Sequence, residues 1–192
     1  MPNKVFYGFS HVYYATATID SDGGATYGAP KALLGGRGIS LQKSGSQNKY
    51  YADNIPFFTY NEEAGTYSGD LEMTLLSDDF LKDCVGMKLD ANNRLYEDAN
   101  SEPPHFALLF QFEGDVAGIR HVFYNCTCTT PDIASQTTEG TNEPKTETVT
   151  ITATPAYFSA LGKYIPRMKA VEGDTGYSTW FTSVVTPAAS TT

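Results

Sequence analysis

Two cysteines two residues apart, Cys126 and Cys128, come nearest in this chain to the spacing of a chemical site. On a β-strand, such residues project from one face, so both thiols could reach one metal ion. A structural zinc site needs two more ligands, but His121 would point to the opposite face and Cys84 lies on a predicted helix. The pattern favours buried free thiols that behave as small apolar side chains, and we expect no metal and no cofactor.

Motifs for nucleophilic catalysis and phosphate binding are incomplete. The segment from Gly8 to Val12 places a serine beside a histidine, but it lacks the second glycine of a nucleophile elbow. Gly162-Lys163 is followed by Tyr164 and has no glycine five residues earlier, so it is not a phosphate-binding loop. The glycines of this chain are therefore interpreted as turn residues.

Histidines and paired carboxylates also give no catalytic pattern. His11, His105 and His121 are scattered, without the spacing that brings two imidazoles to one helix face. The pairs Glu62-Glu63 and Asp78-Asp79 are better explained by solvation and by helix capping than by acid–base catalysis. We expect no catalytic residues and no enzymatic activity.

Composition narrows the class of protein. The 192 residues carry a formal net charge of −9, which argues against partners held by phosphate contacts. The 13 tyrosines and 11 phenylalanines, punctuated by 17 glycines and 10 prolines, favour a mainly β domain. No secretory signal is evident, and the longest wholly apolar run, Phe106–Phe110, is far shorter than the ~20 residues of a membrane span. We expect a chain made in a cytoplasm, with reduced thiols and no membrane partner.

The first half of the chain predicts strands and one long aromatic loop. Lys4–Ile19 is expected to form a strand with a bulge near Gly8–Ser10, and a turn at 20–30 precedes a half-buried strand within Leu33–Lys43. Ser44–Tyr67 shows no periodicity and is interpreted as a long loop.

The clearest alternation follows, with Leu71, Met73 and Leu75 on one face and Asp70, Glu72 and Thr74 on the other. Ser77 is then a typical N-cap for a short helix that should end at Gly86.

The second half predicts further strands. Asp90–Asn93 is a hairpin turn, and alternating phenylalanines and Leu108 mark a strand over 106–112. After a long polar loop near 129–147, Val149, Ile151 and Ala153 alternate with threonines. Weaker strand signals occur in KYIPRMKAV (163–171) and YSTWFTSVV (177–185), before a flexible tail at 186–192. Together these elements predict a single domain over residues 1–192: a two-sheet β-sandwich or partly closed barrel with one short flanking helix.

Several segments, in order, resemble a known family. They are YGAPKAL (27–33), YYADN (50–54), GDLEMTLLSDDFLKDCVG (69–86), LDANNRLYED (89–98) and the stretch 120–155, with its strand, polar loop and threonine-rich strand. Their order and spacing resemble the major tail proteins of bacteriophages with long, non-contractile tails. The resemblance covers most of Val5–Pro155.

This resemblance implies a structural virion protein. The expected function is a tail tube subunit that assembles into hexameric rings, which stack into the conduit for DNA ejection. Implied partners are further copies of the chain and the tape-measure, tail-tip and tail-terminator proteins. DNA would pass through the lumen without specific binding, and the tail would be assembled in the cytoplasm of the host bacterium.

Two sets of residues are candidates for assembly. The polar faces Asp70, Glu72, Thr74 and Thr148, Thr150, Thr152 are candidate lumen-facing positions, although plain outer solvent exposure explains them equally well. In the expected loop 44–67, the candidate ring-stacking residues are Tyr50, Tyr51, Asp53, Asn54, Phe57 and Phe58, because aromatic residues are enriched at interface cores. The same aromatic rings could instead hold the loop against its own domain.

Two other functions stay open. A module that binds carbohydrate or a host surface would need an exposed aromatic platform, for which Trp180 with Tyr177 and Phe181 is the only suitable cluster. An unrecognised hydrolase is the weaker alternative, because no nucleophile stands beside a base.

Overall fold

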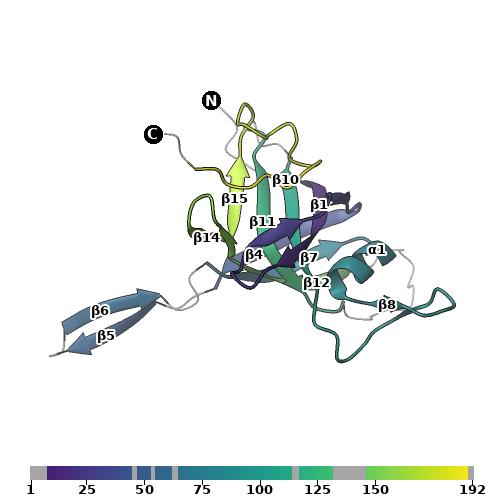
Figure 1. Ribbon diagram of the computed structural model, residues 1–192, viewed down its shortest axis with the longest axis horizontal. Helices are drawn as coiled ribbons and strands as arrows, with labels where there is room; N and C mark the ends of the chain where they lie inside the picture. The colour runs from purple at the N-terminus through teal and green to yellow at the C-terminus, as the bar shows by residue number, and fades with distance from the viewer. Residues whose placement is uncertain are drawn as a thin grey trace, which may run out of the picture.

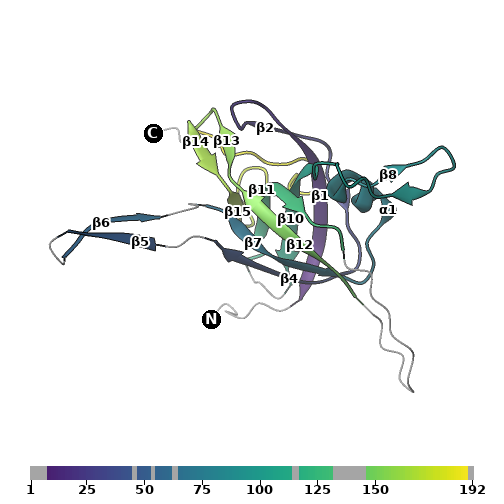
Figure 2. The same cartoon turned by 90° about the horizontal axis from the view of Figure 1, so that it is seen from below.

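The computed structural model describes residues 8–44, 47–52, 55–61, 65–113, 117–131 and 146–189, with backbone alone for 47–52 and 55–61. Strands dominate it, as Figures 1 and 2 show. The strands are β1 (Phe9–Ile19), β2 (Ala25–Tyr27), β3 (Lys31–Ala32), β4 (Gly36–Lys43), β5 (Gln47–Ala52), β6 (Ile55–Asn61), β7 (Tyr67–Met73), β8 (Lys88–Leu89), β9 (Leu95–Tyr96), β10 (His105–Phe112), β11 (Arg120–Cys128), β12 (Glu147–Thr154), β13 (Ala156–Phe158), β14 (Lys163–Ile165) and β15 (Arg167–Ala170). The helical elements are α1 (Asp78–Phe80) and the π-helical turn η1 (Leu81–Val85).

One large antiparallel sheet organises the fold. Its strand order is β2-β1-β10-β11-β12-β7-β4, with β3 also paired to β1 and β15 to β11. The pairs β13–β14, β5–β6 and β8–β9 form three small sheets of their own. The large sheet does not close into a barrel, but it curls until Gly36 of β4 lies against Phe9 and Val12 of β1. The expected mainly β fold with one short helix is confirmed.

The central strands β10 and β11 are buried on both faces. Along β10, Phe106, Leu108 and Phe110 join one buried cluster, whereas Ala107 and Leu109 join a second. A strand that is apolar on both sides must be covered on both sides. The helical turn and the curled outer strands cover one face, and β13–β15 with the C-terminal segment cover the other.

The helix begins and ends as its sequence predicts. The Ser77 hydroxyl oxygen accepts a hydrogen bond from the Phe80 backbone N–H at 3.3 Å, and Gly86 ends the turn in the left-handed region at φ 90°. Phe80 and Cys84 are fully buried in the first cluster. At the surface, the Asp83 carboxylate of η1 accepts a hydrogen bond from Lys31 of β3 at 2.6 Å. This contact joins the helical turn to the sheet.

The segment that follows β15 covers the second cluster without forming a strand. The prediction of a strand over 177–185 is wrong, because the chain there runs through turns. Trp180, in this segment, is fully buried. Its indole N–H donates to the His121 carbonyl at 3.2 Å, and the Tyr124 hydroxyl donates to the Val185 carbonyl at 2.8 Å. This segment is thus held on the sheet by hydrogen bonds between side chains and backbone carbonyls, and not by a ladder of backbone hydrogen bonds.

Other expected elements are confirmed with small differences. The β1 bulge lies between Ser10 and Tyr13, where His11 has φ 51°. β8 and β9 pair around the expected turn, and 163–170 forms two short strands. Leu75 departs from the expected alternation: β7 ends at Met73, and Leu75 is 68% exposed.

The expected loop over 44–67 is a hairpin. β5 and β6 pair with each other in antiparallel fashion and with no strand of the large sheet. Figures 1 and 2 draw this hairpin pointing away from the rest of the fold. The chain therefore runs outward along β4 and β5 and returns along β6 and β7.

The long polar connection is held at both ends. Residues 132–145 lie outside the described part of the chain. Before them, the Thr130 hydroxyl donates to Glu97 at 2.7 Å; after them, the Thr146 hydroxyl donates to Glu72 at 2.8 Å. The Glu147 carboxylate also accepts the Leu76 backbone N–H at 2.6 Å, just before the helix.

The pairing of β4 with β7 depends on Gly69. A Cβ atom built there would overlap the Ser40 carbonyl oxygen, whereas one built at Gly38 of the same ladder meets nothing nearer than Glu72 Oε2 at 3.8 Å. We expect Gly69→Ala to lower the free energy of unfolding by about 1–3 kcal/mol, because the two strands must separate. Gly38→Ala should leave it unchanged or slightly raised. Urea unfolding of both variants tests this, and equal stability for the two would contradict it.

Candidate functional surfaces

β7 and β12 bring the two candidate polar sets together on one face. The strands pair so that Thr148 lies opposite Glu72 and Thr150 opposite Asp70. The Thr150 hydroxyl donates to the Asp70 carboxylate at 2.9 Å, which joins the two strands across the ladder. The intervening Leu71, Met73, Val149, Ile151 and Ala153 are buried. Thr74 is exposed but lies one residue beyond the end of β7.

The neighbouring strand β4 extends this face with further polar residues. Ser40 lies opposite Asp70, and both Ser40 and Gln42 are exposed. At the start of β4, Arg37 lies 4.0 Å from Glu72. The alternation of these residues with Ile39 and Leu41 predicted a half-buried strand, but only the strand order places it beside β7.

We call this surface of β4, β7 and β12 the polar face. Its hydroxyl, amide and carboxylate groups are Ser40, Gln42, Asp70, Glu72, Thr148, Thr150 and Thr152, with Arg37 at one end. Two carboxylates and one guanidinium leave it slightly acidic. Such a surface is hydrated and offers a phosphate backbone almost no cations to bind.

The candidate ring-stacking residues fall on the β5–β6 hairpin. Tyr50 and Tyr51 lie on β5, and Phe57 and Phe58 lie on β6, with Tyr50 paired opposite Phe58. Asp53 and Asn54, at the turn, lie outside the described residues. The structure thus places the aromatic residues on a projecting hairpin rather than on a loop.

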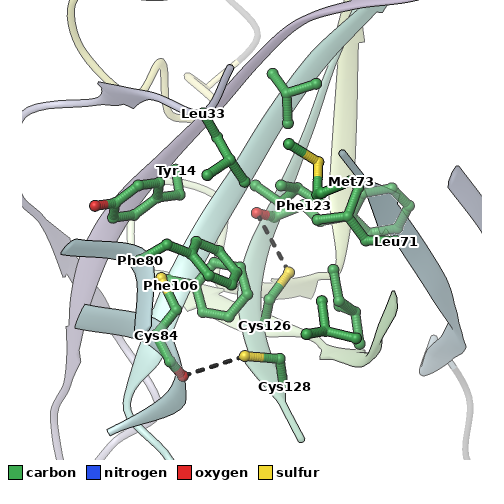
Figure 3. Packing of buried hydrophobic residues seen from close by; sticks show 14 of the residues in the cluster. Tyr14, Leu33, Leu71, Met73, Phe80, Cys84, Phe106, Phe123, Cys126 and Cys128 are labelled. Carbon is green, nitrogen blue, oxygen red and sulfur yellow. Dashed lines mark hydrogen bonds between the residues drawn. The ribbon is translucent and has the colours of Figure 1, made fainter. Parts of the chain in front are cut away.

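The three cysteines lie in one apolar cluster (Figure 3). All are free and buried; the Cys128 thiol donates to the Cys84 carbonyl at 3.3 Å, and the Cys126 thiol lies 3.9 Å from the Phe123 carbonyl. Burial raises the pKa of Cys128 to about 12 and raises the pKa values of Cys84 and Cys126 further still. They are protonated small apolar side chains, as their sequence context predicted, and thiolate is the form that would bind a metal.

Within the described residues, no three histidine, cysteine or acidic side chains gather as metal ligands. The histidines lie in separate settings: His11 stacks on Phe181, His105 contacts the Asn125 side chain at 2.7 Å, and His121 stacks on Phe110. In the same part of the chain, no helix is long and apolar enough to cross a membrane.

Of the two carboxylate pairs, the structure describes only Asp78–Asp79. Asp78 and Asp79 lie in the first turn of α1, and Asp79 accepts a hydrogen bond from Lys82 at 2.6 Å, which lowers its pKa. Helix capping, as predicted, accounts for both. Glu62 and Glu63 lie outside the described residues.

The aromatic platform considered for carbohydrate binding does not exist. Trp180 has no exposed surface, and Phe181 stacks on Tyr13 with ring centroids 4.8 Å apart. Arg120 lies over the Tyr177 ring, 3.8 Å from its centroid, and donates to the Tyr177 carbonyl. These contacts hold the C-terminal segment on the sheet, and the buried Trp180 cannot contribute to an exposed aromatic platform.

Comparison with known proteins gives one informative match. A family model described as "Phage tail tube protein" matches residues 2–181. Among solved structures, the chain is similar to the "Cryo-EM structure of the anti-feeding prophage cap (AFP tube terminating cap)", at 8% identity and a TM-score of 0.43, covering 88% of this chain and 95% of that one. That likeness is too weak to carry an argument. No curated protein matches.

The buried thiols predict a loss of stability in mild alkali. Thiols of the unfolded chain lose protons above about pH 8.5, whereas burial holds the folded-state pKa values higher. The unfolded state then binds fewer protons, so the free energy of unfolding should fall between pH 8 and 10, by up to about 1.4 kcal/mol per pH unit for each thiol.

Urea unfolding at a series of pH values measures this slope. Cys128→Ala removes one titrating thiol. The free energy of unfolding should then fall less steeply with pH, by the equivalent of up to about one bound proton. A slope unchanged by this variant would show that the Cys128 thiol does not contribute.

Proposed function

Because the chain belongs to the phage tail tube protein family, we propose that it is the major tail tube subunit of a long, non-contractile tail. It is a structural component of the virion tail. In the proposed function, copies assemble into hexameric rings, and the rings stack into the conduit for DNA ejection. Assembly takes place in the host cytoplasm with tape-measure, tail-tip and tail-terminator proteins.

The observation that carries this proposal is the polar face beside an open strand edge. β4 ends the large sheet, and within the described residues only β7 pairs with it. Its eight residues leave one row of backbone N–H and C=O groups without a strand partner in the described part of the chain. A strand from a neighbouring copy satisfies these groups, and repetition of this head-to-tail contact closes a ring.

Ring closure through β4 makes the sheets of successive copies continuous. The polar face then lines the lumen, and the first buried cluster lies behind it. A lumen of hydroxyl groups with a slight excess of carboxylates repels the DNA backbone weakly and lets it slide. The net charge of −9 acts in the same direction.

The β5–β6 hairpin supplies a second contact, between rings. It projects from the fold and, within the described residues, pairs with no strand of the large sheet, and the proposal assigns its aromatic residues to contacts with another copy. Aromatic side chains contribute large contact areas at interface cores.

Electron microscopy of the purified protein tests the assembly. In negative stain across a concentration series, with light scattering for mass, we expect six-fold rings and hollow tubes. Chains that stay monomeric at every concentration, even after tail-tip proteins are added as nuclei, would contradict the proposal.

The lumen assignment predicts the effect of added cations. Phage carrying Thr148→Lys and Thr150→Lys should assemble tails but release DNA more slowly at low salt, with recovery at high salt, because phosphate contacts release counterions. Ser159→Lys and Ala160→Lys add the same charge at exposed positions between β13 and β14. Equal ejection rates for the two pairs would show that the polar face does not meet DNA.

A further inference from the structure

The β13–β14 hairpin carries an exposed pair of tyrosines. Tyr157 and Tyr164 lie opposite each other in the ladder, with ring centroids 5.1 Å apart and an interplanar angle of 51°. Tyr164 is 62% exposed, and Tyr157 is half-buried. Aromatic side chains stabilise a fold most when they are buried, so a pair left at the surface is typical of a binding site. The sequence did not reveal this pair, because only the hairpin brings the two rings together.

The turn between β1 and β2 holds these rings in place. The Tyr164 hydroxyl donates to the Asp22 carbonyl at 3.2 Å, and the Tyr157 backbone N–H donates to the Gly23 carbonyl at 2.8 Å. Gly23 has φ 82°, and a Cβ atom built there would lie 3.2 Å from the Tyr164 ring. Figure 2 shows this side of the fold, with β2 beside β13 and β14. Turn and rings are therefore ordered before any ligand arrives, which lowers the entropic cost of binding.

A cleft of about 760 Å³ lies between the turn and the two rings. This volume is within the range of small-molecule sites, about 300–1,000 Å³. The cleft is wide and open to solvent, so a ligand would lie along it without being enclosed. We call it the tyrosine cleft, and it is lined by Asp20, Ser21, Asp22, Gly23, Tyr157 and Tyr164.

The polar groups of the tyrosine cleft are mainly acceptors. Asp20, Ser21 and Asp22 are all exposed. One oxygen of the Asp20 carboxylate accepts the backbone N–H groups of Asp22 and Gly24, at 2.9 and 2.7 Å, and this shapes the turn. Within the described residues, neither carboxylate forms an ion pair with a lysine or arginine. Acceptor oxygens therefore remain available beside the aromatic rings.

An aromatic face with carboxylates at its edge suits a sugar. The C–H groups of a pyranose ring pack on the aromatic ring, while its hydroxyl groups donate charge-assisted hydrogen bonds to the carboxylates. Two carboxylates repel an acidic sugar and favour a neutral or amino sugar. A small organic cation would also suit the charge, but cation–π attraction at an exposed site contributes only about 0.5–1 kcal/mol. The open shape of the cleft therefore favours the sugar.

We propose that the tyrosine cleft binds a non-acidic saccharide, with a sugar ring on Tyr164 and its polar groups on Asp20 and Asp22. This goes beyond the proposed tube function and does not depend on it. β13 packs on the second buried cluster, whereas the polar face has the first cluster behind it, so the two surfaces are separate. In an assembly of many copies, individually weak sites would act together on a surface that carries the saccharide.

Saturation-transfer NMR on the purified full-length chain tests the binding. The probes are tetrasaccharides of glucose, galactose and glucosamine, with the acidic galacturonate tetrasaccharide and choline for comparison. We expect saturation transfer to at least one of the first three and none to galacturonate. Transfer to none of the three, or to choline alone, would overturn the inference. The measurement needs no rings or tubes, so its outcome is independent of the proposed assembly.

Substitution of the exposed tyrosine locates the site. Tyr164→Ala should weaken binding of the saccharide at least about tenfold, because it removes the ring on which the sugar packs. Tyr96→Ala, which removes another exposed tyrosine on β9, should leave binding unchanged. Equal affinities for the two variants, with urea unfolding to confirm that both are folded, would show that the sugar does not bind in the tyrosine cleft.

A charge reversal gives a second variant that keeps both rings. Asp22→Lys should weaken binding of the glucosamine tetrasaccharide at least about tenfold and allow galacturonate to bind, because the sign of the nearby charge changes. Glu172→Lys makes the same change at an exposed position after β15 and should alter neither. An unchanged preference among the saccharides in Asp22→Lys would contradict the assignment.

Discussion

The burial of β10 and β11 on both faces is the constraint on which the rest of this structure depends. Their alternating side chains enter two separate apolar clusters, so neither face tolerates water. Burial stabilises by about 25 cal/mol per Å² of apolar surface, so leaving either face uncovered would remove the stabilisation that its cluster contributes. The curl of the sheet covers one face with its own outer strands and helix. The short strands after β12 and the C-terminal segment cover the other.

The strands that border the first cluster could be predicted from the sequence. Each is buried on one side only, so its apolar and polar residues alternate. Leu71 and Met73 in β7, and Val149 and Ile151 in β12, alternate with polar residues. The helix start at Ser77 could be predicted for a similar reason, because capping acts over a few residues. What the sequence did not reveal was that β7 and β12 are neighbours, since this pairing joins residues about eighty positions apart and depends on the whole sheet.

The wrong predictions share a physical cause. The β5–β6 hairpin pairs with no described strand of the large sheet, and its sequence shows no alternation from which a strand could be predicted. The segment around Trp180 is as aromatic as a strand, yet side-chain hydrogen bonds to distant carbonyls hold it in turns. At Leu75 the alternation continues in the sequence after the ladder has stopped. Local patterns report which side chains are apolar, but not which partner covers them.

The anchored ends of the polar connection between β11 and β12 have a consequence for engineering. The Thr130 hydroxyl is bonded to Glu97, just after β9, and Thr146 and Glu147 are bonded to β7 and to the turn before the helix. These bonds fix the departure and return of the chain independently of what lies between them. Loop closure becomes only slightly more costly as a connection lengthens. We therefore expect the sheet to tolerate an epitope, an enzyme or an affinity tag inserted between Pro131 and Thr146, which would make this connection a site for displaying cargo.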